Sequence, residues 1–254
     1  MPGAAQRSSG GRALTPRLFV DQALAPGAEF DLGGRASRHV QVLRLQPGGA
    51  LILFDGNGGQ WAAAIVRMTR AGVVVRVVAH AAVERELRRP VILAVGMPAN
   101  ERMDGLIEKA TELGVAAIHP LVCERSVLRV AGERAERKSL HWRAVATAAC
   151  EQCGRNRVPE IAAPMALREW LGAGPEPADA GRWMLSLGAS QAWPPASMGN
   201  AAFEVLSGPE GGLTAGEEAA ARAAGFSAYS LGERVLRADT APLAALAWLA
   251  LELR

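Results

Sequence analysis

The chain has 254 residues, half of them hydrophobic, so it is long enough to fold around a substantial core as one large domain or two smaller ones. The first 16 residues lack the apolar segment of a secretion signal, and no uninterrupted apolar run can span a bilayer, so we expect a cytoplasmic protein. Residues 1–90 carry a net charge of +6 and residues 91–254 a net charge of −3, which makes the N-terminal part the candidate for binding a polyanion.

The N-terminal part is predicted to be rich in strands. Short apolar and alternating runs predict strands at 17–20, 29–32, 50–54, 60–68 and 73–80. Residues 55–59 supply the asparagine and glycines typical of a hairpin turn, and one helix is predicted at about 34–45. Together these elements predict a small β-barrel over 17–83, preceded by a flexible tail at 1–16 and followed by a charged linker at 84–90.

From residue 91 onward, predicted strands and helices alternate. Strands are expected at 91–97, 116–122, 158–162, 183–187, 203–206 and 226–231, and helices at 101–113, 137–153, 166–171 and 239–253. A further short helix is expected after Thr214, which stands three residues before Glu217 as in a capping box. This alternation predicts an α/β fold with a parallel sheet. Residues 242–253 are apolar nearly all round, which indicates a buried helix or a subunit interface.

Two loops that contain glycine, at 207–213 and 231–237, lie close together in the chain. The first connects a predicted strand to a helix, and its glycines allow the backbone to touch a ligand directly. It lacks the Gly-Lys-Ser/Thr of a phosphate-binding loop and the glycine spacing of a dinucleotide site. A plain turn would explain one such loop, but two in succession favour a ligand site.

Four motifs together resemble a known family. The sequence Gly-Pro-Glu-Gly-Gly-Leu at 208–213, followed by Leu-Gly-Glu-Arg-Val-Leu-Arg at 231–237, resembles the cofactor-binding knot of SPOUT methyltransferases. Residues 103–114 and 150–159 are similar to signature segments of the RsmE-type enzymes, which methylate uridine N3 in 16S ribosomal RNA. The resemblance extends from about Arg17 to the C-terminus. Because the four motifs occur in one order, the chain is identified as a member of this family.

The resemblance implies a C-terminal SPOUT-type sheet at 91–254 with a trefoil knot near 203–245, and an N-terminal PUA-like RNA-binding barrel. It also implies a homodimer, the cofactor S-adenosylmethionine, and either naked 16S rRNA or the assembled small subunit as substrate. The implied cofactor-binding residues are Leu187, Gly208, Pro209, Glu210, Gly211, Gly212, Leu231, Gly232 and Leu236. The alternatives are methylation of another base or of a ribose 2′-hydroxyl, and a noncatalytic factor in ribosome assembly.

Methylation of uracil N3 removes an imide proton, so negative charge spreads onto O2 and O4. Arginine cannot act as a base at neutral pH but can donate hydrogen bonds to these oxygens, and Arg237 and Arg155 are the catalytic candidates. Asp239 is a candidate base, although capping of the following helix explains it better, and the family usually carries Glu there. Glu210 either attracts the sulfonium cation or satisfies a helix dipole.

The expected RNA-binding residues are Arg17, Arg38, His39, Arg44, Arg102, Asn156 and Arg157. Three of them lie on the predicted helix at 34–45, where a merely solvated basic face is the alternative. Relatives tend to carry a basic residue and a glycine near 98–101, which this chain lacks, and Arg102 could compensate for them. Arg157 follows the end of a predicted helix, where the helix dipole favours a cation, so a structural role is the alternative to RNA binding. A bias of the source genome explains the excess of arginine equally well.

The spacing of Cys150 and Cys153 matches zinc and redox motifs. The pair is predicted to lie in the last turn of a helix, where the dipole opposes a thiolate, and the sequence offers no second paired motif for zinc. We therefore expect buried, reduced thiols and no metal.

Overall fold

The structure is a computed structural model that describes residues 15–70, 72–128, 130, 132–175, 177–189, 191, 193 and 201–253. Residues 1–14 of the predicted tail lie outside the described residues. The chain divides into two compact units between Val83 and Glu84, and each is described by itself. Within the described ranges, no helix is long and apolar enough to cross a membrane.

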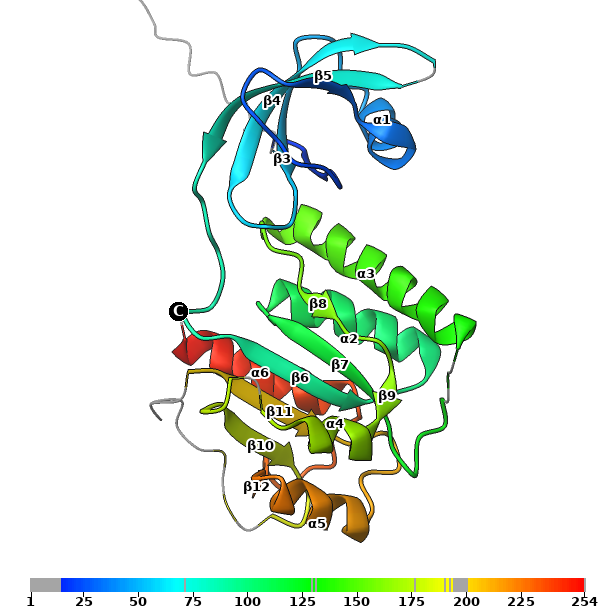
Figure 1. Ribbon diagram of the computed structural model, residues 1–254, viewed down its shortest axis with the longest axis vertical. Helices are drawn as coiled ribbons and strands as arrows, with labels where there is room; N and C mark the ends of the chain where they lie inside the picture. The colour runs from blue at the N-terminus through cyan, green and yellow to red at the C-terminus, as the bar shows by residue number, and fades with distance from the viewer. Residues whose placement is uncertain are drawn as a thin grey trace, which may run out of the picture. The chain divides into compact units, whose positions relative to one another are not determined.

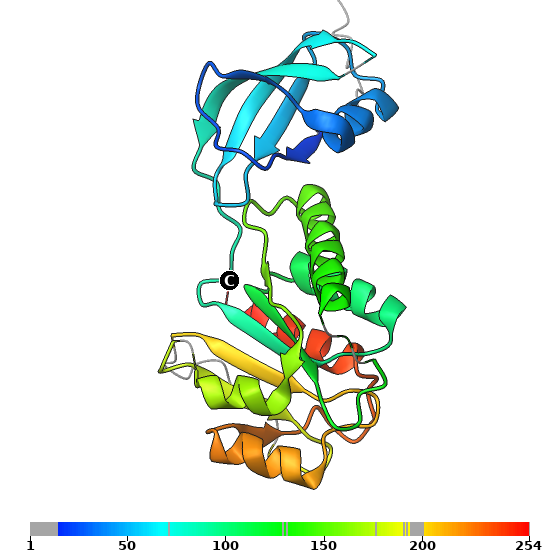
Figure 2. The ribbon, with the colours of Figure 1, turned by 45° about the vertical axis from the view of Figure 1, so that its right-hand side comes forward.

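The first unit is a five-stranded sheet with one helix (Figures 1 and 2). Its strands are β1 (Arg17–Phe19), β2 (Glu29–Asp31), β3 (Ala50–Phe54), β4 (Gln60–Met68) and β5 (Val73–Ala81), in the order β1-β3-β4-β5-β2. β1 and β3 are parallel and the other pairs are antiparallel. All five predicted strands are therefore present, and their ends differ by at most one residue. Alternate residues such as Val73, Val75 and Val77 form the core.

Helix α1 (Gly33–Val42) ends three residues earlier than predicted. Arg44 stops it, because this residue adopts a left-handed conformation with φ 53°. The amides of Arg44 and Leu45 bond back to the carbonyls of Gln41 and Val40, at 2.9 and 3.3 Å. These bonds form the Schellman motif, in which glycine is the usual left-handed residue.

The second unit contains a seven-stranded parallel sheet, as the alternating pattern predicts. Its strands run in the order β12-β10-β11-β6-β7-β8, and β9 pairs with β7. The bounds are β6 (Val91–Gly96), β7 (Ala117–Val122), β8 (Glu160–Ile161), β9 (Met165–Ala166), β10 (Gly181–Leu185), β11 (Phe203–Ser207) and β12 (Ser227–Tyr229). β9 was not predicted, because two residues are too few to show a period.

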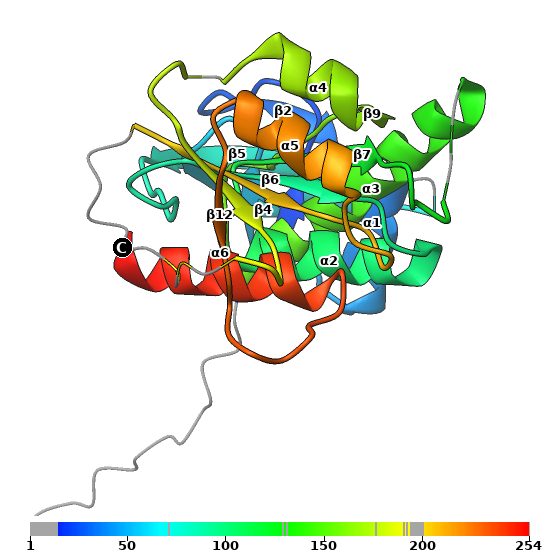
Figure 3. The ribbon, with the colours of Figure 1, turned by 90° about the horizontal axis from the view of Figure 1, so that it is seen from below.

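Helices cover both faces of this sheet, and Figure 3 shows α2 and α6 on one side and α4 and α5 on the other. The helices are α2 (Asn100–Glu112), α3 (Glu133–Cys153), α4 (Leu167–Ala173), α5 (Ala215–Ala223) and α6 (Thr240–Glu252). Neighbouring strand residues point to opposite faces: Val205 joins the core beneath α2, α3 and α6, whereas Leu206 joins the core beneath α4 and α5. The predicted capping box of α5 is present, since Thr214 and Glu217 exchange hydrogen bonds.

Residues 84–90, which are predicted to form a linker, make contacts within the second unit. The amide of Arg88 donates to the carbonyl of Leu253 at 3.0 Å, and Leu87 packs against the core beneath α2. The segment is therefore held against the end of α6.

The protonation of His119 on β7 links the stability of the fold to pH. Its ring packs against Trp170 of α4, and burial lowers the pKa of the imidazole below 6.5, an effect that Glu160 and Glu204 oppose. The unfolded chain takes up a proton near the ordinary pKa while the folded protein does not, so stability is lost as the pH falls below about 6.5. Between pH 7 and pH 5, wild-type protein is expected to lose up to about 2 kcal/mol more free energy of unfolding than His119→Gln. Urea titrations measure this difference, and parallel pH curves for the two proteins would contradict it.

Candidate active site

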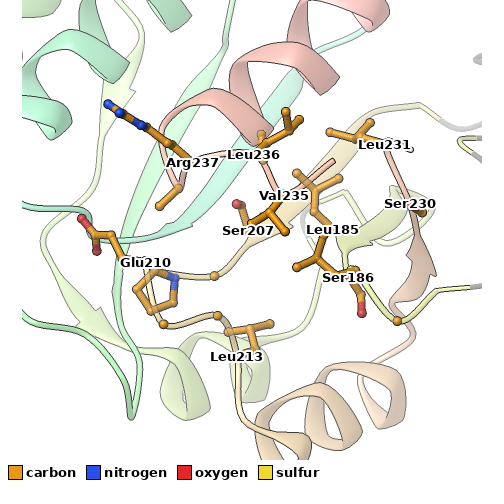
Figure 4. A pocket seen from close by; sticks show the side chains of 18 of the residues that line it. Leu185, Ser186, Ser207, Glu210, Leu213, Ser230, Leu231, Val235, Leu236 and Arg237 are labelled. Atoms are coloured by element: carbon orange, nitrogen blue, oxygen red, sulfur yellow. The ribbon is translucent and has the colours of Figure 1, made fainter. Parts of the chain in front are cut away.

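A pocket of about 560 Å³ lies where the loops after β10, β11 and β12 meet (Figure 4). These strands are neighbours in the parallel sheet, so their carboxyl ends open onto the same edge, which is the usual place for ligands in α/β folds. All nine residues predicted to bind the cofactor line the pocket: Leu187, Gly208, Pro209, Glu210, Gly211, Gly212, Leu231, Gly232 and Leu236. Arg237 and Arg102 line it as well. Two predicted strands extend too far, because residues 186–187 and 230–231 belong to these loops.

The loop after β11 is packed so closely that two positions require glycine. A Cβ on Gly208 would lie 2.8 Å from the amide nitrogen of Leu213. A Cβ on Gly96, the last residue of β6, would lie 2.5 Å from the ring nitrogen of Pro209. The sequence does not show that position 96 requires glycine, because the atoms that exclude a Cβ there belong to a segment more than a hundred residues away.

Glu210 points toward helix α2. Its carboxylate accepts a hydrogen bond from the amide of Ala99 at 2.9 Å, and Arg102 Nη1 lies 4.0 Å from it. Ala99 is the N-cap residue of α2, so Glu210 satisfies the backbone amide that the Glu of a capping box would satisfy. The helix-dipole interpretation of Glu210 thus applies to α2, not to the helix that follows it in sequence.

Further pocket residues make contacts that the sequence does not reveal. Arg125 Nη1 donates to the carbonyl of Gly211 at 2.9 Å and so fixes the loop after β11. Ser186 Oγ donates to Glu218 Oε1 at 2.9 Å, which links the loop after β10 to α5. Residues of both pairs line the pocket, although each pair joins segments far apart in the chain.

Arg237 stands on the loop between β12 and α6 and is exposed. In Figure 4 its side chain and that of Glu210 lie on one side of the pocket, whereas Ser186 lies on the other. Within the described part of the chain, no ion pair or side-chain hydrogen bond engages its guanidinium group, so its donors are available to a substrate.

Comparisons with known proteins identify the family. The sequence profile of an RNA methyltransferase domain matches residues 85–250, and that of an RNA methyltransferase PUA domain matches residues 32–78. A ribosomal RNA small subunit methyltransferase E of Synechocystis is 33% identical, over 95% of this chain and 79% of its own length. The chain belongs to the ribosomal RNA small subunit methyltransferase E family.

Solved structures of two methyltransferases have the same fold. The methyltransferase E of Neisseria gonorrhoeae, bound to S-adenosylmethionine, is 33% identical with a TM-score of 0.85, over 92% of this chain and 95% of its own. A methyltransferase of Legionella pneumophila in complex with the same cofactor gives a TM-score of 0.87 at 33% identity, over 93% and 97% of the two chains. The predicted PUA-like and SPOUT-type units are thus those of methyltransferase E proteins.

Arg155, the second arginine proposed for catalysis in this family member, does not line the pocket. It is buried, its guanidinium forms a two-pronged ion pair with Glu86, and Nη1 donates to the carbonyl of Thr111 at 2.9 Å. A buried arginine held by a carboxylate and a carbonyl has few donors left, so its position favours a role in joining residues 84–90 to the end of α2.

The residues expected to bind RNA are dispersed. Arg38, His39 and Arg44 are exposed on or beside α1, and Arg17 Nη1 donates to Gln60 Oε1 at 2.9 Å. Asn156 is buried, whereas Arg157 is exposed and lies 3.3 Å from Glu84. Their role in binding RNA stays a prediction.

Asp239 occupies the N-cap position of α6 but makes no capping hydrogen bond. Its Oδ1 is buried and has no partner in the described part of the chain, although its neighbour Ala238 lines the pocket. The capping function is therefore absent, and the role of a base stays a hypothesis.

None of the three cysteines forms a disulfide, and Cys150 and Cys153 lie in the last turn of α3 as predicted. Cys123 and Cys150 are buried, but Cys153 is only partly buried. Burial raises the pKa of the Cys123 thiol to about 12. This thiol is therefore protonated at neutral pH.

Proposed function

We propose that this methyltransferase E protein transfers a methyl group from S-adenosylmethionine to N3 of a uridine in 16S rRNA. The observation that carries the proposal is the pocket at the ends of β10, β11 and β12, which contains every residue predicted to bind the cofactor. Its volume of about 560 Å³ suits a ligand of this size. The proteins from Neisseria gonorrhoeae and Legionella pneumophila, solved with the same cofactor, support the choice of ligand.

When bound, the cofactor supplies an electrophilic methyl group on a sulfonium sulfur. As N3 of uracil loses its proton and bonds to the methyl carbon, the carbon–sulfur bond breaks and S-adenosylhomocysteine remains. Arg237 is placed to donate hydrogen bonds to O2 or O4 while these oxygens carry negative charge. We assign this role to Arg237 rather than to Arg155, because Arg155 already donates to Glu86 and to the carbonyl of Thr111. Asp239 is the proposed acceptor of the N3 proton, because its buried oxygen lies unpaired beside the pocket lining.

We propose that the exposed side of α1 contacts RNA phosphate. Arg35, Arg38 and His39 are exposed on this helix, and Arg44 follows it in a conformation that costs a non-glycine residue about 1–2 kcal/mol. An arginine at a position suited to glycine indicates that its side chain has a use.

Arg44→Gly is expected to raise the free energy of unfolding by roughly 0.5–1 kcal/mol, because it removes the strain but adds chain entropy. The same change should weaken RNA binding severalfold and reduce the slope of log affinity against log salt by about 1, as the loss of one phosphate contact predicts. Thermal unfolding and filter binding to 16S rRNA measure the two effects. Arg44→Lys is the control, since it keeps both the strain and the charge. Unchanged RNA affinity in Arg44→Gly would refute the contact.

We further infer that two copies pair through α6, and that residues 203–245 form the trefoil knot typical of the SPOUT fold. Helix α6 is apolar nearly all round: Leu246 and Leu249 are buried, whereas Leu251 is 59% exposed and Trp248 is only partly covered. A second copy would bury these side chains. Sedimentation equilibrium should therefore give twice the mass of one chain.

Small subunits are assembled in the cytoplasm, which is accordingly the proposed location.

The activity is tested by incubating the purified protein and labelled S-adenosylmethionine with small subunits, and separately with naked 16S rRNA, both lacking the modification. Nuclease digestion and mass spectrometry then locate the methyl group. N3-methyluridine at one position is the expected product, and the preferred substrate shows the assembly state that the enzyme requires. If the methyl group is found on another base or on a ribose, the protein is an RNA methyltransferase of different specificity. Failure of calorimetry to detect cofactor binding would instead indicate a noncatalytic assembly factor.

A further inference from the structure

Two carboxylates line the pocket, and they have different partners. Glu210 is bound to the amide of Ala99 and faces Arg102, so it serves the N-terminus of α2. Glu218, in the first turn of α5, has no structural role in capping, because Thr214 and Glu217 already form the capping box of that helix. Its carboxylate lines the pocket and is therefore available to a ligand there.

The carboxylate of Glu218 is held in place at both oxygens. Ser186 Oγ donates to Oε1 at 2.9 Å, and Arg222 Nη2 donates to Oε2 at 2.8 Å. The side chain of Glu218 is 26% exposed, so a ligand in the pocket has access to it. Each carboxylate oxygen can accept two hydrogen bonds, which leaves one acceptor site on each oxygen. Two neighbouring donors on a ligand would satisfy both sites.

The charge of Glu218 argues against a cationic group as its partner. Arg222 forms an ion pair with it, which offsets the negative charge that would attract a sulfonium or ammonium group. A pair of neutral hydroxyl groups needs no net charge, only two acceptors at a fixed spacing, and hydrogen bonds to an ionised carboxylate are stronger than neutral ones. A vicinal diol is thus the ligand group that fits this carboxylate best.

The location agrees with this assignment. Ser186 lies on the side of the pocket away from Arg237, the residue assigned to the uracil oxygens (Figure 4). The reacting methyl group must be near Arg237, and the nucleoside part of the cofactor can then extend toward Ser186. We propose that Glu218 holds the ribose 2′- and 3′-hydroxyls of the cofactor and that Ser186 positions its carboxylate. This inference rests on the proposed function, since it requires an adenosine ligand in this pocket.

Calorimetry with adenosine ligands tests the proposal without relying on activity. The full-length protein, Glu218→Gln and Ser186→Ala are titrated with S-adenosylhomocysteine and with its 2′,3′-dideoxy analogue. Glu218→Gln should weaken binding of S-adenosylhomocysteine by about tenfold to a hundredfold, because a charge-assisted acceptor is lost. It should leave binding of the dideoxy analogue unchanged. Ser186→Ala should weaken only the hydroxylated ligand, and by less.

Glu136→Gln, at an exposed position of α3 away from the pocket, is the matched control and should bind both ligands as wild type does. Equal losses for both ligands in Glu218→Gln would show that the residue only shapes the pocket, and no loss would show that it does not touch the ligand; either result overturns the proposal. If wild-type protein binds neither ligand, the proposed function itself fails.

Discussion

Replacing Arg237 by alanine is expected to lower kcat for methyl transfer by about a hundredfold to a thousandfold, the usual effect of removing one donor to a developing oxyanion. Arg237 lines the pocket and is exposed, so its removal should not disturb the core. The affinity for S-adenosylmethionine should change little, because the guanidinium acts on the uracil as charge develops. Single-turnover kinetics on small subunits, together with calorimetry for the cofactor, separate the two quantities.

Two variants sharpen this result. Arg237→Lys keeps the charge but loses the planar fork of donors, so its kcat should lie between those of wild type and Arg237→Ala. Arg168→Ala removes an exposed arginine from α4, outside the pocket lining, and should retain wild-type kcat. A wild-type kcat in Arg237→Ala would exclude the assigned role. If only the affinity for the cofactor falls, Arg237 contacts the cofactor and not the uracil.

Gly96→Ala is expected to reduce the free energy of unfolding by about 1–3 kcal/mol, the cost of forcing a methyl group into a packed site. The added Cβ would meet backbone atoms of Gly208 and Pro209 at 2.9 and 2.5 Å, and backbone cannot rotate away as a side chain can. The loop after β11 must therefore shift, and a displacement of this size should lower kcat/KM by about a hundredfold. Urea unfolding and steady-state kinetics measure the two effects.

Gly105→Ala is the matched control for Gly96→Ala. Gly105 lies within α2, and a Cβ there would meet nothing within 4 Å. Because alanine is the better helix former, this variant should be more stable than wild type by roughly 0.5–1 kcal/mol, with unchanged kcat/KM. The same substitution is thus expected to have opposite effects at two positions. Equal behaviour of the two variants would contradict the close contact between β6 and the loop after β11.

Local patterns predicted the elements well where they are long. The apolar stripe of Met103, Leu106 and Ile107 faces the core as its helical spacing requires, and α6 begins and ends within one residue of its prediction. Short or irregular elements were less predictable: β9 was missed, and α3 begins four residues before its predicted start. Arg44 ends α1 early by adopting a conformation that its residue type does not predict.

The sequence by itself determined the parallel α/β unit, the strand-rich first unit, the glycine loops and the family, because periodicity, turn residues and motif order are properties of neighbouring residues. Only the tertiary structure showed that Arg155 lies outside the pocket lining and that Arg125, Ser186 and Glu218 belong to it. Glu210 caps a helix through an amide 111 positions away, and Arg155, a catalytic candidate by motif, is held by Glu86, 69 positions away. Hydrogen bonds between distant segments depend on how strands pair and helices pack, so no local pattern records them.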